Sequence, residues 1–448
     1  VQGKKLADAG SEYAVWYRSA DMRATSDATL PLHTEWFPGW HVAVLRAGVP
    51  DGDTAFYLNG YAMHGHRHYD TLGILYYAGG KELASDRGYI WDDPRNAWTK
   101  STLAHNIVTV DGSNQNTKQR ESHLDLFAVA PGIEVVQASA NAYTQCDRYQ
   151  RTCVMVQLPE GETYVVDIFR VQGGKKHQYG FNGNGNLIAL GTEEPEPIDE
   201  KIKWLDHLRA VAPTGPFTAT WEYQDMRMDL MVLNPIDRVI VADAPGWRSD
   251  RGSELDAAPI QQLLAERTSA DGATTSQYVT VIVSYAGDES PVRSAHLLAN
   301  DSTTGLVAVE VERAGRTDIL VSSLDGTPRQ IDSVTLAGQF GFVSRGASGK
   351  TQQAYLLAGT RLQCGDVELT RETATTGLKV ASVEDRTFHL VDILPEGSVT
   401  AGQYVLGGGT GYEIESAGQR TITVRDYPIV ACDEITLLHD AFWQVPVR

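Results

Sequence analysis

The chain has 448 residues and a formal net charge of −19. Its hydrophobic share of 42% and charged share of 21% are ordinary for a globular protein and exclude intrinsic disorder, and every apolar run is too short for a membrane-spanning helix. The negative charge argues against nucleic acids and anionic membranes as partners, and it makes an acidic polysaccharide a suitable substrate only where a basic cleft offsets the global field.

Short apolar or alternating segments, separated by turn residues, recur along the chain. This texture is typical of an all-β protein and predicts a large antiparallel sandwich. Helical signal is weak, and its best candidates are residues 7–19 and 260–267. The predicted strands are residues 42–45, 74–77, 107–110, 164–171, 228–232, 239–242, 278–284, 306–311 and 319–322.

The texture changes after about residue 345. Residues 344–350 are rich in glycine and serine and predict a connector. The strands and turns that follow predict a smaller C-terminal β domain. Residues 407–411 are almost all glycine, but they lack the Lys-Ser/Thr pair and the helix of a phosphate loop, so we expect a hairpin turn there.

Cysteine is scarce, and no pair has the CxxC spacing of a zinc-binding motif. Cys146 and Cys153 are the closest pair. They could close a short hairpin by a disulfide in an oxidising compartment, or all four cysteines could be buried thiols.

Three histidines, His64, His66 and His68, lie in one heptapeptide that ends at Asp70. In an extended segment, side chains at i and i+2 share a face, so these side chains can project together. Two or three histidines with one aspartate, gathered from successive strands, are suitable ligands for zinc. The alternative is a histidine-rich turn that bonds only to carbonyls and water.

The segment from Trp36 to about Asn116 resembles the β-sheet domain of the heparinase II/III-like polysaccharide lyases, which include related alginate lyases. The similarity is carried by Gly39-Trp40 and by residues 44–46, 64–72, 84–89 and 101–112, of which the last block is the most specific. A looser similarity extends to about residue 185. The resemblance implies a large antiparallel super-β-sandwich, followed here by the smaller C-terminal β domain.

The resemblance also implies a site and a reaction. A uronic-acid lyase removes the C5 proton beside a carboxylate and expels the 4-O-glycoside by β-elimination, which requires a base, an acid and neutralisation of the carboxylate. One Zn²⁺ ion, mainly structural, organises the cleft. The predicted site has His66 and Tyr89 as catalytic residues, His64, Arg67, Asn106 and Trp91 as substrate-binding residues, and His68, Asp86 and His105 as metal ligands.

Members of this family carry an α/α-toroid domain ahead of the sheet domain, which supplies a catalytic tyrosine and an Asn-His pair. We find no such toroid in this sequence and expect it on a separate polypeptide of the same enzyme. Alternatively, the base is Tyr61, Tyr69 or Tyr89, or the protein binds glycans without cleaving them. The predicted division is residues 1–30 as a linker or tail of a helical domain, 31–345 as the super-β-sandwich and 350–448 as the C-terminal β domain.

Two weaker features bear on the substrate. Arg148, Arg151 and Arg170, with Lys175-Lys176, form a basic stretch that could line a cleft for uronate or sulfate groups, or could be scattered surface charges. Trp91 and Trp98 could stack on sugar rings or anchor the core.

The leading hypothesis is the β-sheet part of a lyase acting on an acidic, uronate-containing polysaccharide, with a periplasmic or secreted location expected from the size of such a substrate. The sequence contains neither GxSxG nor HExxH, which sets aside serine hydrolases and zincin proteases. The alternatives are a non-catalytic carbohydrate-binding protein and a mononuclear zinc glycan hydrolase.

Overall fold

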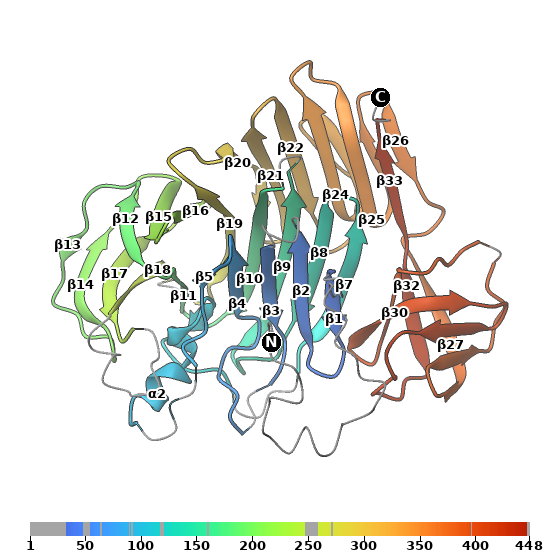
Figure 1. The fold of residues 1–448 in the computed structure, drawn as a ribbon, viewed down its shortest axis with the longest axis horizontal. Helices are drawn as coiled ribbons and strands as arrows, with labels where there is room; N and C mark the ends of the chain where they lie inside the picture. Colours follow the sequence, from blue (N-terminus) through green and yellow to red (C-terminus); the bar gives the residue numbers. More distant parts are fainter. Residues whose placement is uncertain are drawn as a thin grey trace, which may run out of the picture. The chain divides into compact units, whose positions relative to one another are not determined.

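The structure is a computed structural model, and it describes residues 33–47, 54–62, 65–88, 90, 93–116, 121–158, 161–246, 259–269, 272–395 and 397–445. Within these ranges the strands form four antiparallel sheets and a closed barrel, which confirms the all-β prediction (Figure 1). The helical elements described there are only α2 (Asn96–Thr99) and the 3₁₀ turn η2 (Thr102–Ala104), and no described helix could cross a membrane.

Two sheets carry the N-terminal half of the sandwich. The first sheet has the order β1 (Glu35–Phe37), β2 (Val42–Ala47), β3 (Thr54–Asn59), β4 (Ile74–Ala78), β5 (Lys81–Ala84). The middle sheet has the order β12 (Asn186–Leu190), β15 (Phe217–Tyr223), β16 (Met226–Val232), β19 (Thr275–Ala286), β10 (Thr163–Gly173), β9 (Cys146–Gln157), β8 (Ile133–Ser139), β7 (His123–Ala130).

Two further sheets flank the middle sheet. The third sheet has the order β13 (Glu196–Pro197), β14 (Asp206–Val211), β17 (Arg238–Ala244), β18 (Ile260–Thr268), β11 (Lys176–Asn182), β6 (Val108–Val110). The fourth has the order β20 (Val292–Asp301), β21 (Leu306–Arg313), β22 (Arg316–Ser322), β24 (Val334–Gly346), β25 (Thr351–Cys364), β26 (Val367–Thr370), with β23 (Arg329–Ile331) on β24 and β33 (Asp440–Gln444) on β25.

The middle sheet is buried on both faces. Because side chains alternate along a strand, Val165 and Phe169 of β10 enter a core shared with the first and third sheets, whereas Tyr164 and Ile168 enter a core shared with the fourth sheet. This layering confirms the predicted large antiparallel sandwich.

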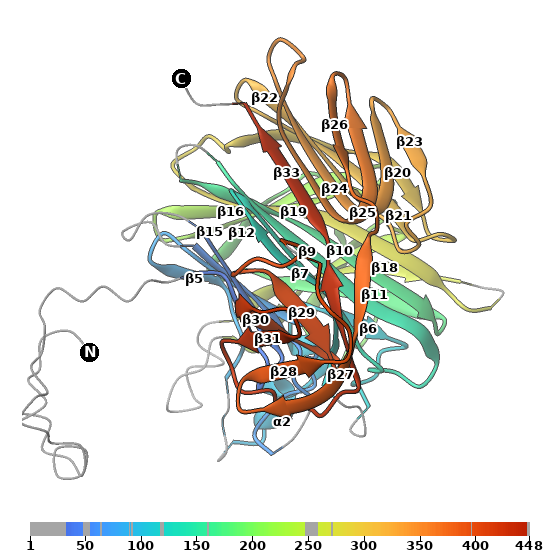
Figure 2. The ribbon, with the colours of Figure 1, turned by 90° about the vertical axis from the view of Figure 1, so that its right-hand side faces the viewer.

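The closed barrel has its own core. Its strands follow the order β27 (Thr375–Glu384), β28 (Thr387–Leu390), β31 (Thr421–Val424), β30 (Thr410–Ala417), β29 (Tyr404–Gly407), β32 (Glu434–Leu438). Figure 2 shows the barrel in red beside β7. The predicted hairpin turn is confirmed, because Gly407 pairs with Thr410 across the β29–β30 turn.

The segment predicted as a connector, residues 344–350, is not a linker between domains. It forms the end of β24 and the turn into β25, and Ser344 pairs with Gln353 across that hairpin. The predicted domain division, 31–345 and 350–448, stays a prediction. The strand pairing groups the chain differently: the strands of the closed barrel begin at Thr375, and those of the fourth sheet continue past residue 350.

The helix predicted at residues 260–267 is wrong, because this segment is strand β18. Its Gln, Leu, Ala and Glu residues favour a helix locally. However, Leu263 and Leu264 pack in two different cores, as neighbours on a strand must, and β11 and β17 bond to both edges. Tertiary pairing therefore overrides local propensity. The other helical candidate, residues 7–19, lies outside the described residues.

Of the two alternatives for Cys146 and Cys153, the disulfide does not form, and all four cysteines are free thiols. Both residues lie on the single strand β9. Seven residues of extended chain separate their Cα atoms by about 23 Å, far beyond disulfide reach.

One buried carboxyl group joins the first sheet to the middle sheet. Glu134 of β8 accepts hydrogen bonds from the Thr34 hydroxyl and, at 2.9 Å, from the Arg46 amide of β2. Burial raises the pKa of Glu134 to about 7, against the opposing effect of these two hydrogen bonds.

The raised pKa of Glu134 predicts a fall in stability between about pH 5 and pH 7. Over that range the folded chain holds this proton while the unfolded chain has lost it, so the free energy of unfolding decreases as the pH rises. Glu134→Gln should therefore gain thermal stability relative to the wild type as the pH rises, measured by melting temperature at pH 5 to 8. The exposed Glu312→Gln is the control and should show no such trend. Parallel curves for Glu134→Gln and the wild type would contradict the assignment.

Candidate metal centre

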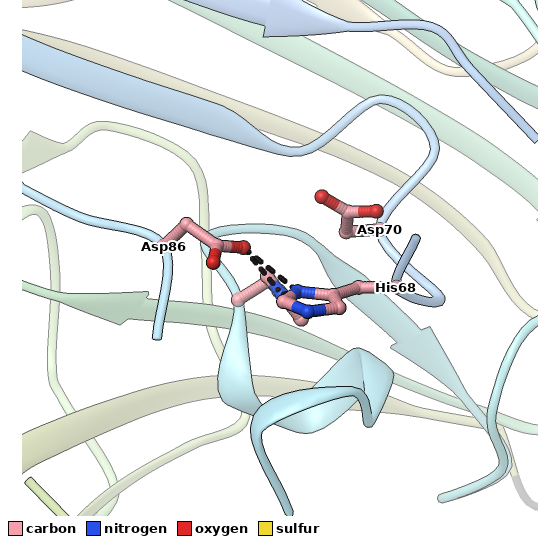
Figure 3. A group of neighbouring side chains, drawn as sticks. His68, Asp70 and Asp86 are labelled. Atoms are coloured by element: carbon pink, nitrogen blue, oxygen red, sulfur yellow. Dashed lines mark hydrogen bonds and ion pairs between the residues drawn. The ribbon is translucent and has the colours of Figure 1, made fainter. Parts of the chain in front are cut away.

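Four side chains that could ligate a metal converge at one point: His68, Asp70, Asp86 and His105, whose ligand atoms all lie within 4.8 Å of one another. Asp86 Oδ2 lies 3.0 Å from His68 Nδ1 and 3.0 Å from His105 Nε2, and the two imidazole nitrogens are 3.1 Å apart. Figure 3 shows the Asp86 carboxylate facing the His68 ring, with Asp70 beside that ring. The structure thus brings together the three predicted ligands and adds Asp70.

These residues come from three segments that sheet pairing places side by side. His68 and Asp70 lie in the connection from β3 to β4, Asp86 follows β5 and His105 follows η2. The connection closes tightly: the Gly73 amide donates to the Asp70 carbonyl, and a Cβ at Gly73 would lie 2.8 Å from that oxygen. Only glycine fits this turn, so it holds Asp70 in position.

Asp70 is buried, with 1% of its surface exposed, and only one of its oxygens is satisfied. Oδ2 accepts hydrogen bonds from the Tyr61 hydroxyl at 2.9 Å and from Asn59 Nδ2 at 3.2 Å. Oδ1 has no hydrogen-bond partner within the described part of the chain. A buried carboxylate oxygen with no partner is costly, and a cation held with His68 and His105 would satisfy it.

The tautomer of His105 is set by its outer contact. Nδ1 lies 2.8 Å from the Ser101 carbonyl, which can only accept, so Nδ1 carries a proton and Nε2 faces the cluster. Nε2, His68 Nδ1 and Asp86 Oδ2 then meet at 3.0 to 3.1 Å, which requires a positive charge among them. Ligand atoms about 2.0 Å from a tetrahedral zinc ion lie about 3.3 Å apart, so this donor set fits zinc.

The pKa shifts in the cluster also indicate that positive charge is favoured there. Burial raises the pKa of Asp70 above its usual range. Burial acts on Asp86 in the same direction, but hydrogen bonds from His105 and His68 outweigh it and hold the pKa of Asp86 well below its usual range. Burial alone would lower the pKa of His105, but the hydrogen bond with Asp86 and the charge of Asp70 raise it. A proton or a metal ion is therefore strongly favoured here.

Arg151 connects this cluster to the middle sheet. It is fully buried on β9 and pairs with Asp167 of β10 through Nε and Nη2, at 2.8 and 2.7 Å. Its Nη1 donates to the carbonyls of Leu72 at 2.8 Å and Asn106 at 2.7 Å. Leu72 and Asn106 follow Asp70 and His105, so one guanidinium fixes the spacing of two ligand-bearing segments.

The segment with the predicted catalytic residue His66 and the predicted substrate-binding residue Arg67 lies beside the cluster. His66 is exposed in the turn two residues before His68. The Arg67 guanidinium lies over the rings of Trp40 and Tyr61, with centroid distances of 5.4 and 5.2 Å. These contacts direct Arg67 to the surface around the cluster, where Trp40 is 62% exposed.

Asn106 and Trp98 take structural positions. The Asn106 side chain is 1% exposed, and its Oδ1 accepts a hydrogen bond from the Asn182 amide at 2.8 Å. Its role in substrate binding stays a prediction. Trp98 is fully buried and donates to the Pro245 carbonyl at 3.2 Å, so the core-anchoring alternative holds for this tryptophan.

Three predicted site residues, His64, Tyr89 and Trp91, lie outside the described residues. The sequence interpretation missed Asn59 and Tyr61 as supports of Asp70. Their role depends on the chain returning from β3 to β4 so that residues about ten apart meet, and no local motif signals this. Burial, first, and then the charge of Asp70 raise the pKa of Tyr61 far above its usual value, which argues against Tyr61 as a base.

The fold and this cluster define a β-sandwich protein with a candidate metal centre, and the family can be named from the sequence. Residues 29–268, more than half of the chain, match the family described as "Heparinase II/III-like, C-terminal". The chain belongs to this family, and the predicted resemblance is confirmed.

Two curated relatives match a part of the chain. The alginate lyase of Stenotrophomonas maltophilia is 28% identical over 207 residues, which cover 39% of this chain and 27% of that protein. The exo-oligoalginate lyase of Saccharophagus degradans is 26% identical over 194 residues, which cover 36% and 26%. The matched part of this chain thus spans about a quarter of the length of each of these relatives.

Two solved structures match a part of the chain at low identity. A heparinase III gene product matches with a TM-score of 0.49 and 18% identity, covering 66% of this chain and 43% of that chain. The heparan sulfate lyase HepC from Pedobacter heparinus matches with a TM-score of 0.47 and 15% identity, with the same coverage.

The position of Arg151 predicts a large effect on both the fold and the cluster. Arg151→Met leaves Asp167 buried without its partner, so we expect a loss of about 3 to 5 kcal/mol in the free energy of unfolding, measured by urea denaturation. The matched control is Arg361→Met, which removes an ion pair with Glu368 in which both side chains are 47% exposed, and should cost less than about 1 kcal/mol. Equal effects of the two substitutions would show that Arg151 has no special role.

Proposed function

We propose that this chain is the β part of a polysaccharide lyase that cleaves a uronate-containing polysaccharide by β-elimination, with one Zn²⁺ ion held in the cluster. The observation that carries the proposal is the convergence of His68, Asp86 and His105, with Asp70, in a chain of the heparinase II/III-like family. The names of the two curated relatives support a uronate polymer and make alginate the first substrate to test.

The reaction assigns roles to the exposed groups beside the cluster. The C5 proton of a uronate is weakly acidic, so the neighbouring carboxylate must be neutralised while negative charge builds on it. His66, exposed next to the cluster, and Arg67, held over Trp40 and Tyr61, are placed for this neutralisation or for moving a proton.

His68, Asp86 and His105 would hold the zinc ion, and Asp70 would add a fourth ligand or a charge partner. The ion would supply mainly structural constraint, since the four groups come from three separate segments of the chain. Because His66 and Arg67 directly precede His68, this constraint would fix the side of the cleft that contacts substrate.

The catalytic base is proposed to come from an α/α-toroid polypeptide of the same enzyme. The Tyr61 hydroxyl is already bonded to Asp70, and burial disfavours its ionisation. A polymeric substrate supports a periplasmic or secreted location, which we include in the proposal.

The activity test follows ultraviolet absorbance, because β-elimination creates an unsaturated uronate whereas hydrolysis creates only a new reducing end. We expect absorbance to rise with alginate when the chain is combined with its toroid polypeptide, and we expect His66→Ala to abolish the rise with unchanged melting temperature. A new reducing end without absorbance would indicate a hydrolase instead. Glycan binding with no covalent change in any sample would indicate a binding protein.

The metal assignment is tested by zinc content and thermal stability. Asp86→Asn and His68→Ala should reduce zinc from about one ion per chain toward zero and lower the melting temperature, because the bound ion stabilises only the folded chain. The control His389→Ala removes another imidazole beside a carboxylate, 3.7 Å from Glu384 on the barrel, and should leave zinc unchanged. Full zinc content in His68→Ala would show that the ligand assignment is wrong.

A further inference from the structure

A polar groove lies between the middle sheet and the barrel, and none of its lining residues belongs to the metal cluster. A cavity of about 630 Å³ opens there, and an adjoining cavity of about 310 Å³ shares His123, Arg148 and Gln150 with it. We call the two together the barrel groove. The β29–β30 turn forms part of its wall and is tied to β7 by a hydrogen bond from the Leu124 amide to the Gly409 carbonyl, at 2.9 Å.

The floor of the barrel groove is polar because of strand alternation. Arg148 and Gln150 project from one face of β9, while Tyr149 between them enters the hydrophobic core on the other face. Gln137 of β8 lies on the same floor as Gln150. The wall formed by residues 407–409 is all glycine, so no side chain from that turn fills the space above the floor.

Arg148 supplies a positive charge to this floor that nothing in the fold uses. It is half-buried, and its side chain makes no hydrogen bond or ion pair with any other described residue. One carboxylate that lines the groove, Asp125, already accepts hydrogen bonds from His123 at 3.0 Å, Ser139 at 3.1 Å and Gln150 at 2.8 Å. Three further carboxylate residues line the groove: Glu434 on the barrel side, and Glu121 and Asp147 at the adjoining cavity.

A second guanidinium, that of Arg170, adds to the positive charge of Arg148. Arg170 is fully buried and donates only to neutral oxygens: the Gly305 carbonyl at 3.0 Å, the Thr152 hydroxyl at 3.0 Å and the Ser322 hydroxyl at 2.9 Å. Burial, and then the charge of Arg148, lower the pKa of Arg170 to about 9. Buried charges in proteins are normally paired, so two adjacent guanidiniums bonded to no described carboxylate favour an anionic ligand.

We propose that the barrel groove binds the acidic group of a saccharide, a carboxylate or a sulfate, with Arg148 as its ion partner. A guanidinium matches the planar fork of a carboxylate and bonds well to sulfate oxygens, while the side-chain amides of Gln137 and Gln150 suit sugar hydroxyls. The combined volume is in the range of ligand-binding cavities. The choice of a saccharide as carrier rests on the proposed function, whereas the anion site rests on the groove itself.

The test is calorimetric titration of the full chain carrying His66→Ala, so that binding is measured without turnover. The probes are a carboxylated oligouronate, a sulfated oligosaccharide, a neutral oligosaccharide of equal length and inorganic sulfate. We expect an acidic oligosaccharide to bind and Arg148→Gln to weaken it at least about tenfold, with Arg148→Lys intermediate because it keeps the charge but loses the fork. The control Arg293→Gln removes an exposed arginine of β20 and should bind as the parent does.

The outcomes separate the ligand sources and the two proposals. Tighter binding of the carboxylated probe, or of the sulfated probe, supports the site and identifies the acid. Equal affinity in Arg148→Gln and the parent, equal binding of the neutral probe, or binding of inorganic sulfate alone would overturn the proposal. Because no step requires elimination, a failure here leaves the absorbance test of the metal-centre proposal intact, and the reverse also holds.

Discussion

The arrangement of this site depends on one buried guanidinium. Arg151 pairs with Asp167 at the centre of the middle sheet and bonds the carbonyls of Leu72 and Asn106, the segments that carry Asp70 and His105. The Tyr179 hydroxyl donates to the same carboxylate at 2.8 Å, so the third sheet joins this network. A buried pair of this kind stabilises little by itself, but removal of either partner leaves a charge uncompensated. The metal ligands are therefore positioned by the core of the sandwich as well as by their own loops.

The sequence predicted the residues of the metal cluster better than the residues that hold them in place. Strand alternation and the family resemblance both pointed to His68, whereas Asp86 and His105 were found from the family resemblance alone. Arg151 was grouped with Arg148 and Arg170 as a basic stretch, because a sequence shows the charge of a residue but not the face of the strand on which it lies. Asp167, in the middle of the apolar run of β10, was the available signal, since a carboxylate in such a run requires a buried partner.

The failed predictions share a cause. The segment of β18 favours a helix locally, and residues 344–350 have the composition of a linker, yet both are determined by strands far away in the sequence. Pairing of β18 with β11 and β17 stabilises the strand by more than the local helix propensity favours a helix. The all-β prediction from the alternating pattern was correct. Alternation reflects the burial of the two faces of a strand, and sheet packing depends on that burial.

The chain's net charge of −19 constrains how it can recognise an acidic polymer. Exposed charges farther apart than about 8 Å are largely screened at physiological salt, so the global repulsion is weak at contact and a few close cations decide binding. Arg67 lies over two aromatic rings beside the metal cluster, and Arg148 lies in the barrel groove without a carboxylate partner among the described residues. Each would meet an acid group at short range, where a guanidinium–carboxylate contact is strongest. If both proposals hold, the protein has two separate cationic points on an otherwise acidic surface at which it can bind acid groups.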